Sequence, residues 1–183
     1  METRAGTLAV PVYCPSFHTL TSGPQVDPVP RTSFYLDPAM LHSTDAEIRD
    51  TLNAVHSIAV VGWSPNPDRP SHRVARFLAQ QGYRVIAVNP GQAGQMALGE
   101  VVRANLSEIA GGVDMVDIFR RSEEAGAVVD QALAAFPNLK AVWMQLGVTD
   151  TEAAKRAEAR GVTAIMNRCP AIEIPRLGIA AKA

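Results

Sequence analysis

The sequence predicts an α/β fold, in which a doubly wound parallel sheet of about five strands is covered by helices on both faces. Two observations lead to this prediction. Short apolar runs alternate with segments whose apolar residues recur at helical spacing, and the connections between them are short. Strands that are buried between two helical layers read as continuous apolar runs, as these do. The runs expected to form strands are 58–61, 84–88, 113–119, 140–144 and 162–166.

Capping patterns predict where the first and fourth helices begin. The run Thr44–Glu47 has the form of a capping box, and the helix that follows has Ile48 and Leu52 on its inner face. The run Thr149–Glu152 has the same form and predicts a helix that Gly161 closes. Each of these helices precedes an apolar run, which supports the alternation.

Two further helices are expected between strands. Ser71 is expected to cap a helix that ends at Gly82, and Ser122 to cap a helix with acidic residues in its first turn. Between the second and third strands lies a glycine-rich loop, followed by a weaker helical stretch around Leu106 and Ile109. This loop is the least regular part of the predicted domain.

The first 42 residues differ from the rest of the chain. They hold six of the thirteen prolines and show neither helical nor strand periodicity. We therefore expect an irregular N-terminal extension over 1–42 and one domain over 43–178. We expect local packing of the extension through Phe34, Tyr35 and Leu36.

The composition narrows the classes of partner. Hydrophobic residues make up 47% of the chain, charged residues 19%, and the net charge is −1, so nothing favours nucleic acid or an anionic membrane surface. No apolar run approaches the ~20 residues that a bilayer requires. Cys14 and Cys169 are too few to indicate a disulfide framework. A cytoplasmic protein is the expectation.

Polar residues that follow the predicted strands indicate the ligand site, because ligands of such sheets bind outside the carboxyl ends of the strands. Gly62 ends the first strand and opens a proline-rich loop to Ser71, which supplies hydroxyl, amide and guanidinium groups. Arg120 and Arg121 follow the third strand just before a helix N-terminus, where a phosphate binds well. The alternatives are that the prolines only stiffen a turn and that the arginines are surface charge.

The loop does not match a dinucleotide fingerprint. Ser64 and Pro67 stand where the second and third glycines are expected. Asn89, followed by Pro90, replaces the acidic residue that holds a ribose diol at the end of the second strand. A ligand that carries phosphate, but is not NAD, fits this pattern better.

Candidate catalytic groups are few. No pair of histidines has metal-ligand spacing, and His72 reads more simply as a solvated residue of a first helical turn. Cys169 follows the fifth strand but has no obvious histidine partner for nucleophilic catalysis. Asp114 and Asp117, at the third strand, are expected to make structural hydrogen bonds.

Several motifs in order resemble the small stand-alone CoA-binding proteins, whose Rossmann-like domain is similar to the N-terminal domain of the succinyl-CoA synthetase α subunit. The resemblance runs from about Thr44 to Glu173. The chain departs from it at Trp63, where relatives commonly have a smaller residue, so the mouth of the loop would be narrowed. It departs again at Asn167, which replaces an acidic residue. The motifs that carry the resemblance are 58–71, 88–90, 113–122, 141–147 and 168–170.

The resemblance implies a coenzyme A site at the strand ends. The 62–71 loop would meet the diphosphate, Asn89-Pro90 the adenosine, and the 119–122 and 145–147 turns the remaining phosphate and pantetheine. The synthetase's phosphohistidine region has no counterpart here. The residues implied are Gly62, Trp63, Ser64, Pro65, Asn66, Arg69, Ser71, Asn89, Pro90, Phe119, Arg120, Arg121, Ser122, Gln145 and Gly147.

The sequence thus predicts a non-catalytic protein that binds CoA or acyl-CoA. Two alternatives stay open. One is an enzyme, either an NAD(P)-dependent oxidoreductase or a thiol-active protein that uses Cys169. The other is a protein-interaction module with a vestigial pocket, docked through residues 1–42.

Overall fold

The computed structural model describes residues 43–182, and the predicted N-terminal extension lies outside this range. Five parallel strands form one sheet in the order β2-β1-β5-β6-β7. The doubly wound α/β prediction is therefore confirmed. The main strands are β1 Ser57–Val61, β2 Arg84–Val88, β5 Met115–Ile118, β6 Ala141–Met144 and β7 Thr163–Ile165.

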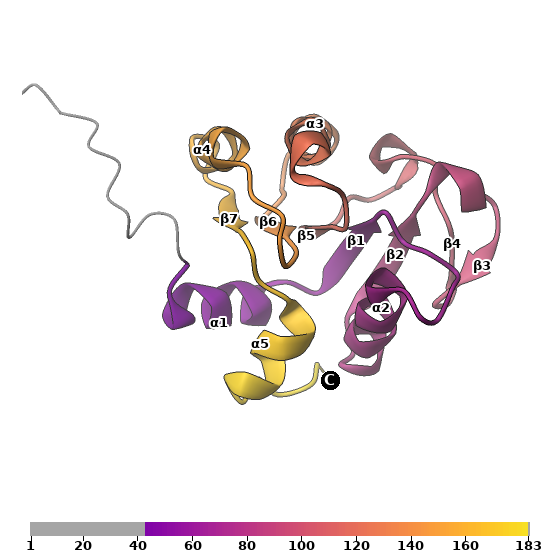
Figure 1. Ribbon diagram of the computed structural model, residues 1–183, viewed down its shortest axis with the longest axis horizontal. Helices are drawn as coiled ribbons and strands as arrows, with labels where there is room; N and C mark the ends of the chain where they lie inside the picture. The colour runs from indigo at the N-terminus through magenta and orange to yellow at the C-terminus, as the bar shows by residue number, and fades with distance from the viewer. Residues whose placement is uncertain (1–42, 183) are drawn as a thin grey trace, which may run out of the picture. The chain divides into compact units, whose positions relative to one another are not determined.

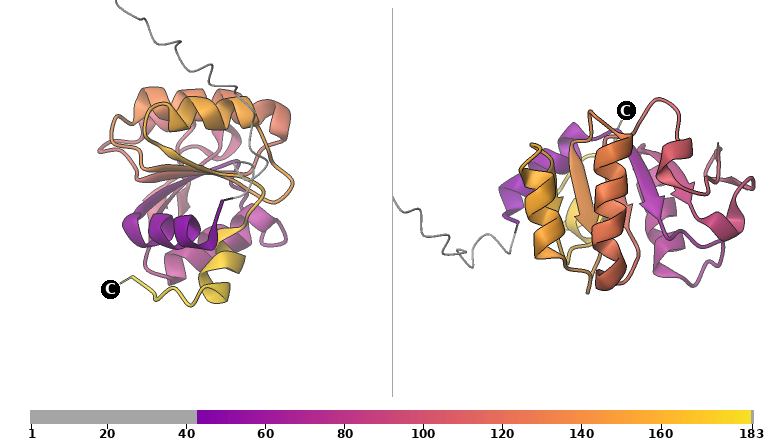
Figure 2. Two further views of the ribbon diagram at one scale, coloured as in Figure 1. Left: turned by 90° about the vertical axis from the view of Figure 1, so that its left-hand side faces the viewer. Right: turned by 90° about the horizontal axis from the view of Figure 1, so that it is seen from above.

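Five α-helices cover the two faces of the sheet. The helices α3 and α4 lie on one face, and α1, α2 and α5 lie on the other (Figures 1 and 2). No helix within residues 43–182 is long and apolar enough to cross a bilayer. The helices are α1 Asp45–Ala54, α2 Pro70–Gln80, α3 Ser122–Ala135, α4 Thr151–Glu158 and α5 Pro170–Arg176.

Successive side chains along each strand point to opposite faces of the sheet, so they pack into two separate hydrophobic cores. In β1, Ala59 and Val61 pack under α3 and α4, whereas Ile58 and Val60 pack against α1, α2 and α5. Trp143 of β6 is fully buried in the second core. Burial on both faces explains why the strands read as unbroken apolar runs.

The predicted helix starts are correct in part. Thr44 and Glu47 form the expected capping box of α1, with the Glu47 N–H donating to Thr44 Oγ1 (3.2 Å). The predicted cap at Ser71 is wrong, because α2 begins one residue earlier at Pro70. Proline suits this first helical position, where its fixed φ is helical and its missing N–H costs no hydrogen bond. Ser71 is instead buried in the first turn.

Two other predicted caps are also wrong. Arg121 is the N-cap of α3, and Ser122 is its first residue, whose Oγ accepts from Thr149 N–H (3.0 Å). Asp150 rather than Thr149 caps α4, accepting from Ala153 N–H at 2.9 Å. Asp150 lies next to Thr149 and can cap the helix in its place, since Asp caps at least as well as Thr.

The sequence did not predict α5 or the structure after β2. The expected helical stretch around Leu106 is only one turn of 3₁₀-helix, and a short antiparallel hairpin precedes it. Short elements of this kind carry almost no periodic signal. They are η2 Pro90–Gln92, β3 Met96–Ala97, β4 Glu100–Val101 and η3 Leu106–Glu108.

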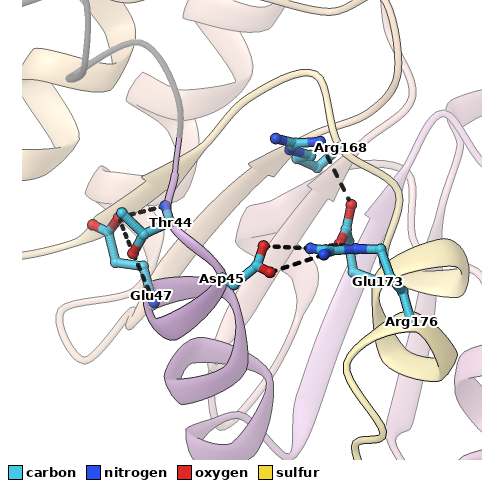
Figure 3. A network of polar contacts seen from close by, with 6 residues as sticks. All are labelled: Thr44, Asp45, Glu47, Arg168, Glu173 and Arg176. Atoms are coloured by element: carbon cyan, nitrogen blue, oxygen red, sulfur yellow. Dashed lines mark hydrogen bonds and ion pairs between the residues drawn. The ribbon is translucent and has the colours of Figure 1, made fainter.

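A polar network joins α1 to α5 (Figure 3). Arg176 donates to both carboxylate oxygens of Asp45 (2.6 and 2.9 Å) and to Glu173 Oε2 (2.7 Å). Glu173 is only 3% exposed, and Arg168 approaches its other oxygen at 3.9 Å. The network holds α5 against the first turn of α1, so α5 fixes the Arg168–Cys169 turn beside the sheet.

Candidate ligand-binding site

The chain leaves β1 and β5, which are neighbours in the sheet, toward opposite faces. After β1 it passes to α2, and after β5 it passes to α3 on the other face (Figure 1). The divergence opens a crevice at the carboxyl ends of these strands, where doubly wound folds bind ligands. Gly62 and the 119–122 turn border this crevice.

Gly62 has no room for a side chain. Its φ is +86°, and a Cβ at this position would overlap the carbonyl oxygen of Phe119. Its N–H donates to Val88 O (3.0 Å), which ties the start of the loop to the end of β2. Glycine is therefore required both by the left-handed backbone and by the contact with β5.

The side chains of the 62–71 loop mostly stabilise the loop itself. Asn66 N–H donates to Ser64 Oγ (3.3 Å), and Asp68 N–H donates to Asn66 Oδ1 (2.9 Å). His72 Nδ1 lies 3.1 Å from Ser64 O. Pro65, Asn66 and Arg69 are exposed on the loop. These local bonds pre-form the loop without a ligand.

Trp63 lies in the core instead of narrowing the mouth of the loop. Its side chain is 5% exposed and belongs to the core beneath α2. The ring stacks on His72, with centroids 6.0 Å apart. Its Nε1 is buried and has no hydrogen-bond partner in the described part of the chain. The indole anchors the loop to α2, so the loop moves with the body of the domain.

Asn89 connects the two strand ends. Its Nδ2 donates to Trp63 O (2.6 Å), and its Oδ1 accepts from Gly91 N–H (2.9 Å). An aspartate could not donate the first of these bonds. The presence of asparagine instead of an acidic residue at position 89 therefore has a structural reason.

A hollow of about 350 Å³ lies beside Asn89, on the α3 face of the sheet. Its floor is apolar and its rim is polar, the usual character of a small-molecule site. Four predicted site residues line it: Gly62, Asn89, Pro90 and Arg120. The other lining residues are Val61, Val88, Ala104, Asn105, Leu106, Glu124, Ala127, Val128 and Gln131.

The sequence did not identify this second set. Residues 104–106 belong to the irregular connection after β2, where the sequence predicted only a weak helical stretch around Leu106. Glu124, Val128 and Gln131 recur at helical spacing along α3. That spacing was visible in the sequence, but none of the three residues was predicted to line a site.

The two arginines after β5 differ in position. Arg120 lines the hollow, and its Nε lies 3.6 Å from Glu124 Oε2. The Arg121 side chain is 82% exposed and lies 3.3 Å from the same carboxylate. Phe119, before them, turns to the other face and packs against the core of α2. Arg120 is thus the guanidinium closest to the crevice among the predicted pair.

The 145–147 turn is held by buried polar contacts. Gln145 is 6% exposed, and its Nε2 donates to both carboxylate oxygens of Asp117 (2.9 and 3.1 Å). Burial raises the pKa of Asp117 to about 7, although the Gln145 bond acts in the opposite direction. The amide nitrogen of Gln145 is therefore already engaged within the protein.

Ser122, Gly147 and Asn167 meet above the ends of β6 and β7. Ser122 Oγ lies 3.4 Å from Gly147 O, and Gly147 N–H donates to Asn167 Oδ1 (2.8 Å). Asn167 has a φ of +52°, which asparagine tolerates better than most residues. Asn167, which stands in place of the acidic residue that the resemblance implies, therefore holds the 145–147 turn in position.

The hydrogen bonds expected of Asp114 and Asp117 are both present. Asp114 Oδ2 accepts from the N–H groups of His56 (2.8 Å) and Ser57 (3.1 Å). Burial alone would raise the pKa of Asp114, but bonds from Lys140 and these amides outweigh it and lower the pKa to about 2. Asp114 thereby joins the amino ends of β1 and β5.

Cys169 is the N-cap of α5 and is 7% exposed. Burial raises the pKa of its thiol, which disfavours the thiolate that nucleophilic chemistry requires. Within residues 43–182, no three His, Cys, Asp or Glu side chains are grouped as metal ligands are.

Comparisons with known proteins identify the family of the chain. A family model described as a CoA binding domain matches residues 56–175. The uncharacterized protein YneT of Bacillus subtilis strain 168 is 38% identical over 130 residues, covering 71% of this chain and 93% of YneT.

Two solved structures are similar to this chain over most of their own length. The Thermus thermophilus protein ID.343 is 35% identical with a TM-score of 0.68, covering 74% of this chain and 99% of its own. A hypothetical protein from Pyrococcus horikoshii OT3 is 33% identical with a TM-score of 0.67, covering 74% and 92%.

A more distant likeness extends to a large enzyme. The dinucleotide-forming acetyl-coenzyme A synthetase 1 of Ca. Korarchaeum cryptofilum is 23% identical with a TM-score of 0.52, and the match spans 61% of this chain and 26% of the synthetase. At this identity the likeness shows a similar fold and nothing further. The match to the family model and the relatives above 30% identity confirm the resemblance, and the chain belongs to the CoA-binding domain family.

Proposed function

We propose that this protein binds coenzyme A or an acyl-CoA at the carboxyl ends of β1, β2 and β5 and does not transform it. The hollow beside Asn89 carries the proposal, since it lies at the crevice of a fold whose family is described by CoA binding. Its volume of about 350 Å³ is at the lower end of the range for ligand pockets, as suits one part of an extended ligand.

The adenosine part fits the hollow itself. Val61, Val88 and Leu106 provide an apolar floor on which a purine can lie. Asn105 and Gln131 on the rim offer donors and acceptors for the edge of the base. Asn89 and Pro90 border the same space at the end of β2, where Rossmann-like folds meet the ribose.

The diphosphate would lie over Gly62, between the first loop and the start of α3. With no side chain at Gly62, a phosphate can approach the backbone closely. Arg120 borders the crevice, and the N-terminus of α3 adds the positive end of a helix dipole. Ser64 and Asn66 act on this site by fixing the loop.

The pantetheine arm would continue toward Ser122 and Gly147, where the turns after β5 and β6 meet. Gln145 supports this region from below through its bond to Asp117. The buried thiol of Cys169 has a raised pKa, which supports binding without thiol chemistry.

Isothermal titration calorimetry with the full chain tests the proposal. We expect CoA to bind with one molecule per chain and more weakly at high salt, because the phosphate contacts are charge-assisted. The absence of CoA binding at millimolar concentration, or tighter binding of NAD than of CoA, would overturn it.

The thiol alternative requires a separate measurement. Intact-mass spectrometry under oxidising conditions with saturating CoA would detect a mixed disulfide. We expect no adduct at Cys169, since its sulfur is buried and its thiolate is disfavoured. A stoichiometric adduct that disappears in Cys169→Ser would replace the non-catalytic assignment with a thiol-active one.

A further inference from the structure

We propose that Arg103 reads the phosphate on the adenosine ribose, so that the protein distinguishes CoA from dephospho-CoA. This inference rests on the proposed function, and it concerns a residue outside the set that the sequence motifs indicate.

The backbone of Arg103 is attached to the end of β2. Arg103 pairs with Val88 in an isolated parallel bridge. Its carbonyl oxygen accepts from Asn89 N–H (2.9 Å), and its own N–H donates to Ala87 O (3.0 Å). Arg103 is therefore fixed next to the strand end that borders the hollow.

The alternation of neighbouring residues places the Arg103 side chain on the face of the hollow. Val102 packs into the core beneath α2, so the next residue points to the opposite face. Val88, its bridge partner, belongs to the α3-side core and lines the hollow. Ala104 and Asn105, which follow Arg103 in the chain, line the hollow as well, so Arg103 adjoins the hollow through these neighbours and is not itself one of its lining residues.

The guanidinium of Arg103 lacks the partner that a half-buried charge normally has. Its Nε is buried and makes no hydrogen bond with any residue from 43 to 182. Among residues 43–182 no side-chain hydrogen bond or ion pair of Arg103 is present, whereas Arg84 on the same strand edge pairs with Glu100 at 2.6 Å. An unpaired donor of this kind costs stability, and a bound anion would remove that cost.

The position of Arg103 at the end of β2 indicates which kind of anion it would bind. In Rossmann-like folds the end of the second strand meets the adenosine ribose, and an arginine nearby accommodates a phosphate on that sugar. CoA carries such a phosphate on the 3′ oxygen and NADP on the 2′ oxygen, while dephospho-CoA and NAD carry none. The shared chemistry is a phosphomonoester dianion, which a guanidinium binds in a bidentate manner.

Calorimetry with four ligands tests the inference: CoA, dephospho-CoA, NADP and NAD, each against wild type, Arg103→Gln and Arg160→Gln. Arg160 is the matched control, because it is an exposed arginine after α4, at the opposite edge of the sheet. We expect wild type and Arg160→Gln to bind CoA roughly ten- to a hundredfold more tightly than dephospho-CoA. In Arg103→Gln this preference should disappear while the affinity for dephospho-CoA stays unchanged.

The possible outcomes test the role of Arg103 separately from CoA binding itself. Equal wild-type affinity for CoA and dephospho-CoA, or a preference that survives in Arg103→Gln, overturns the role of Arg103 and leaves CoA binding intact. Failure of both CoA forms to bind contradicts the proposed function itself, and selective NADP binding replaces it. If Arg103→Gln does not fold, Arg103→Lys keeps the charge but not the bidentate geometry, and we expect it to retain only part of the preference.

Discussion

The Nδ2 group of Asn89 donates a 2.6 Å hydrogen bond to the main-chain oxygen of Trp63. This bond joins the end of β2 to the loop that follows β1, across the mouth of the proposed site. On the far side of the loop, the buried Trp63 ring is fixed in the core beneath α2. The loop is thus held from both sides before any ligand arrives, which reduces the ordering cost of binding.

Replacement of Asn89 by aspartate tests this connection. Asp is isosteric and can still accept from Gly91, but it places a carboxylate oxygen against the Trp63 carbonyl. We expect Asn89→Asp to lower the free energy of unfolding by about 1–3 kcal/mol. CoA affinity should fall as well, because the loop loses its tether and the rim gains a negative charge. Calorimetry and urea unfolding measure the two effects.

The matched control is Asn138→Asp, the same change at an exposed asparagine in the turn before β6. It should leave both quantities nearly unchanged. If Asn89→Asp binds CoA as wild type does, the tether has no role in the site.

Gly62→Ala tests the close approach of β1 and β5. A comparison of alanine substitutions at Gly62 and Gly111, which have similar backbone angles, separates the steric clash of the new methyl group from the strain of a positive φ. At Gly62 a methyl group would meet the Phe119 carbonyl, whereas at Gly111 (φ +79°) there is nothing within 4 Å. Both variants are strained by a positive φ, at a cost of about 1–3 kcal/mol. We expect Gly62→Ala to lose more stability than Gly111→Ala, and to lose CoA binding. Equal losses in thermal unfolding would show that the Phe119 contact has no consequence.

The parallel sheet could be predicted from the sequence because its signal is repeated in every strand. The run that ends at Gly62 and the run that ends at Asn89 were both placed at the carboxyl edge, and they meet there. The starts of α2 and α3 were misplaced, since several residues near each start can cap a helix and tertiary contacts decide between them. Ser122 shows this: its hydroxyl bonds the chain before α4 instead of its own helix.

The hollow could not be predicted from single motifs. Three of its thirteen lining residues are 104–106, whose position depends on the parallel bridge between Val88 and Arg103. One isolated bridge leaves no periodicity in a sequence. Conversely, Ser71 and Gln145 were predicted as site residues from their chain positions, and the structure places both in buried surroundings. A position after a strand indicates the edge of the sheet, but not the direction of the side chain.

The α1–α5 network predicts a stability effect at Glu173 (Figure 3). This buried carboxylate accepts from Arg176 at 2.7 Å, and Glu173→Gln replaces one acceptor oxygen by a donor that faces a guanidinium. We expect a loss of about 1–3 kcal/mol in the free energy of unfolding. Glu158→Gln, at an exposed position at the end of α4, is the control and should change little. Equal behaviour of the two variants in urea unfolding would contradict a structural role for the network.

The buried Asp117 predicts how stability depends on pH. Burial raises its pKa to about 7 in the folded protein, while the carboxyl of an unfolded chain titrates near 3.8. Between these values the folded state holds a proton that the unfolded state has released. The contribution of Asp117 to stability is therefore complete below about pH 4, declines as the pH rises to about 7, and is constant above that. The total change is on the order of a few kcal/mol.

Asp117→Asn removes this titration and should change the pH profile in one direction. Relative to wild type, the variant should gain stability as the pH rises from 4 to 7, because it has no buried carboxyl to ionise. Asp114→Asn is the control: the pKa of Asp114 is lowered to about 2, so its stabilising effect is lost only as the pH falls below about 4. Urea midpoints at pH 4.5, 6 and 8 measure the difference. A constant gap between wild type and Asp117→Asn across this range would mean that Asp117 ionises in the folded protein as readily as in the unfolded chain, against its full burial beneath Gln145.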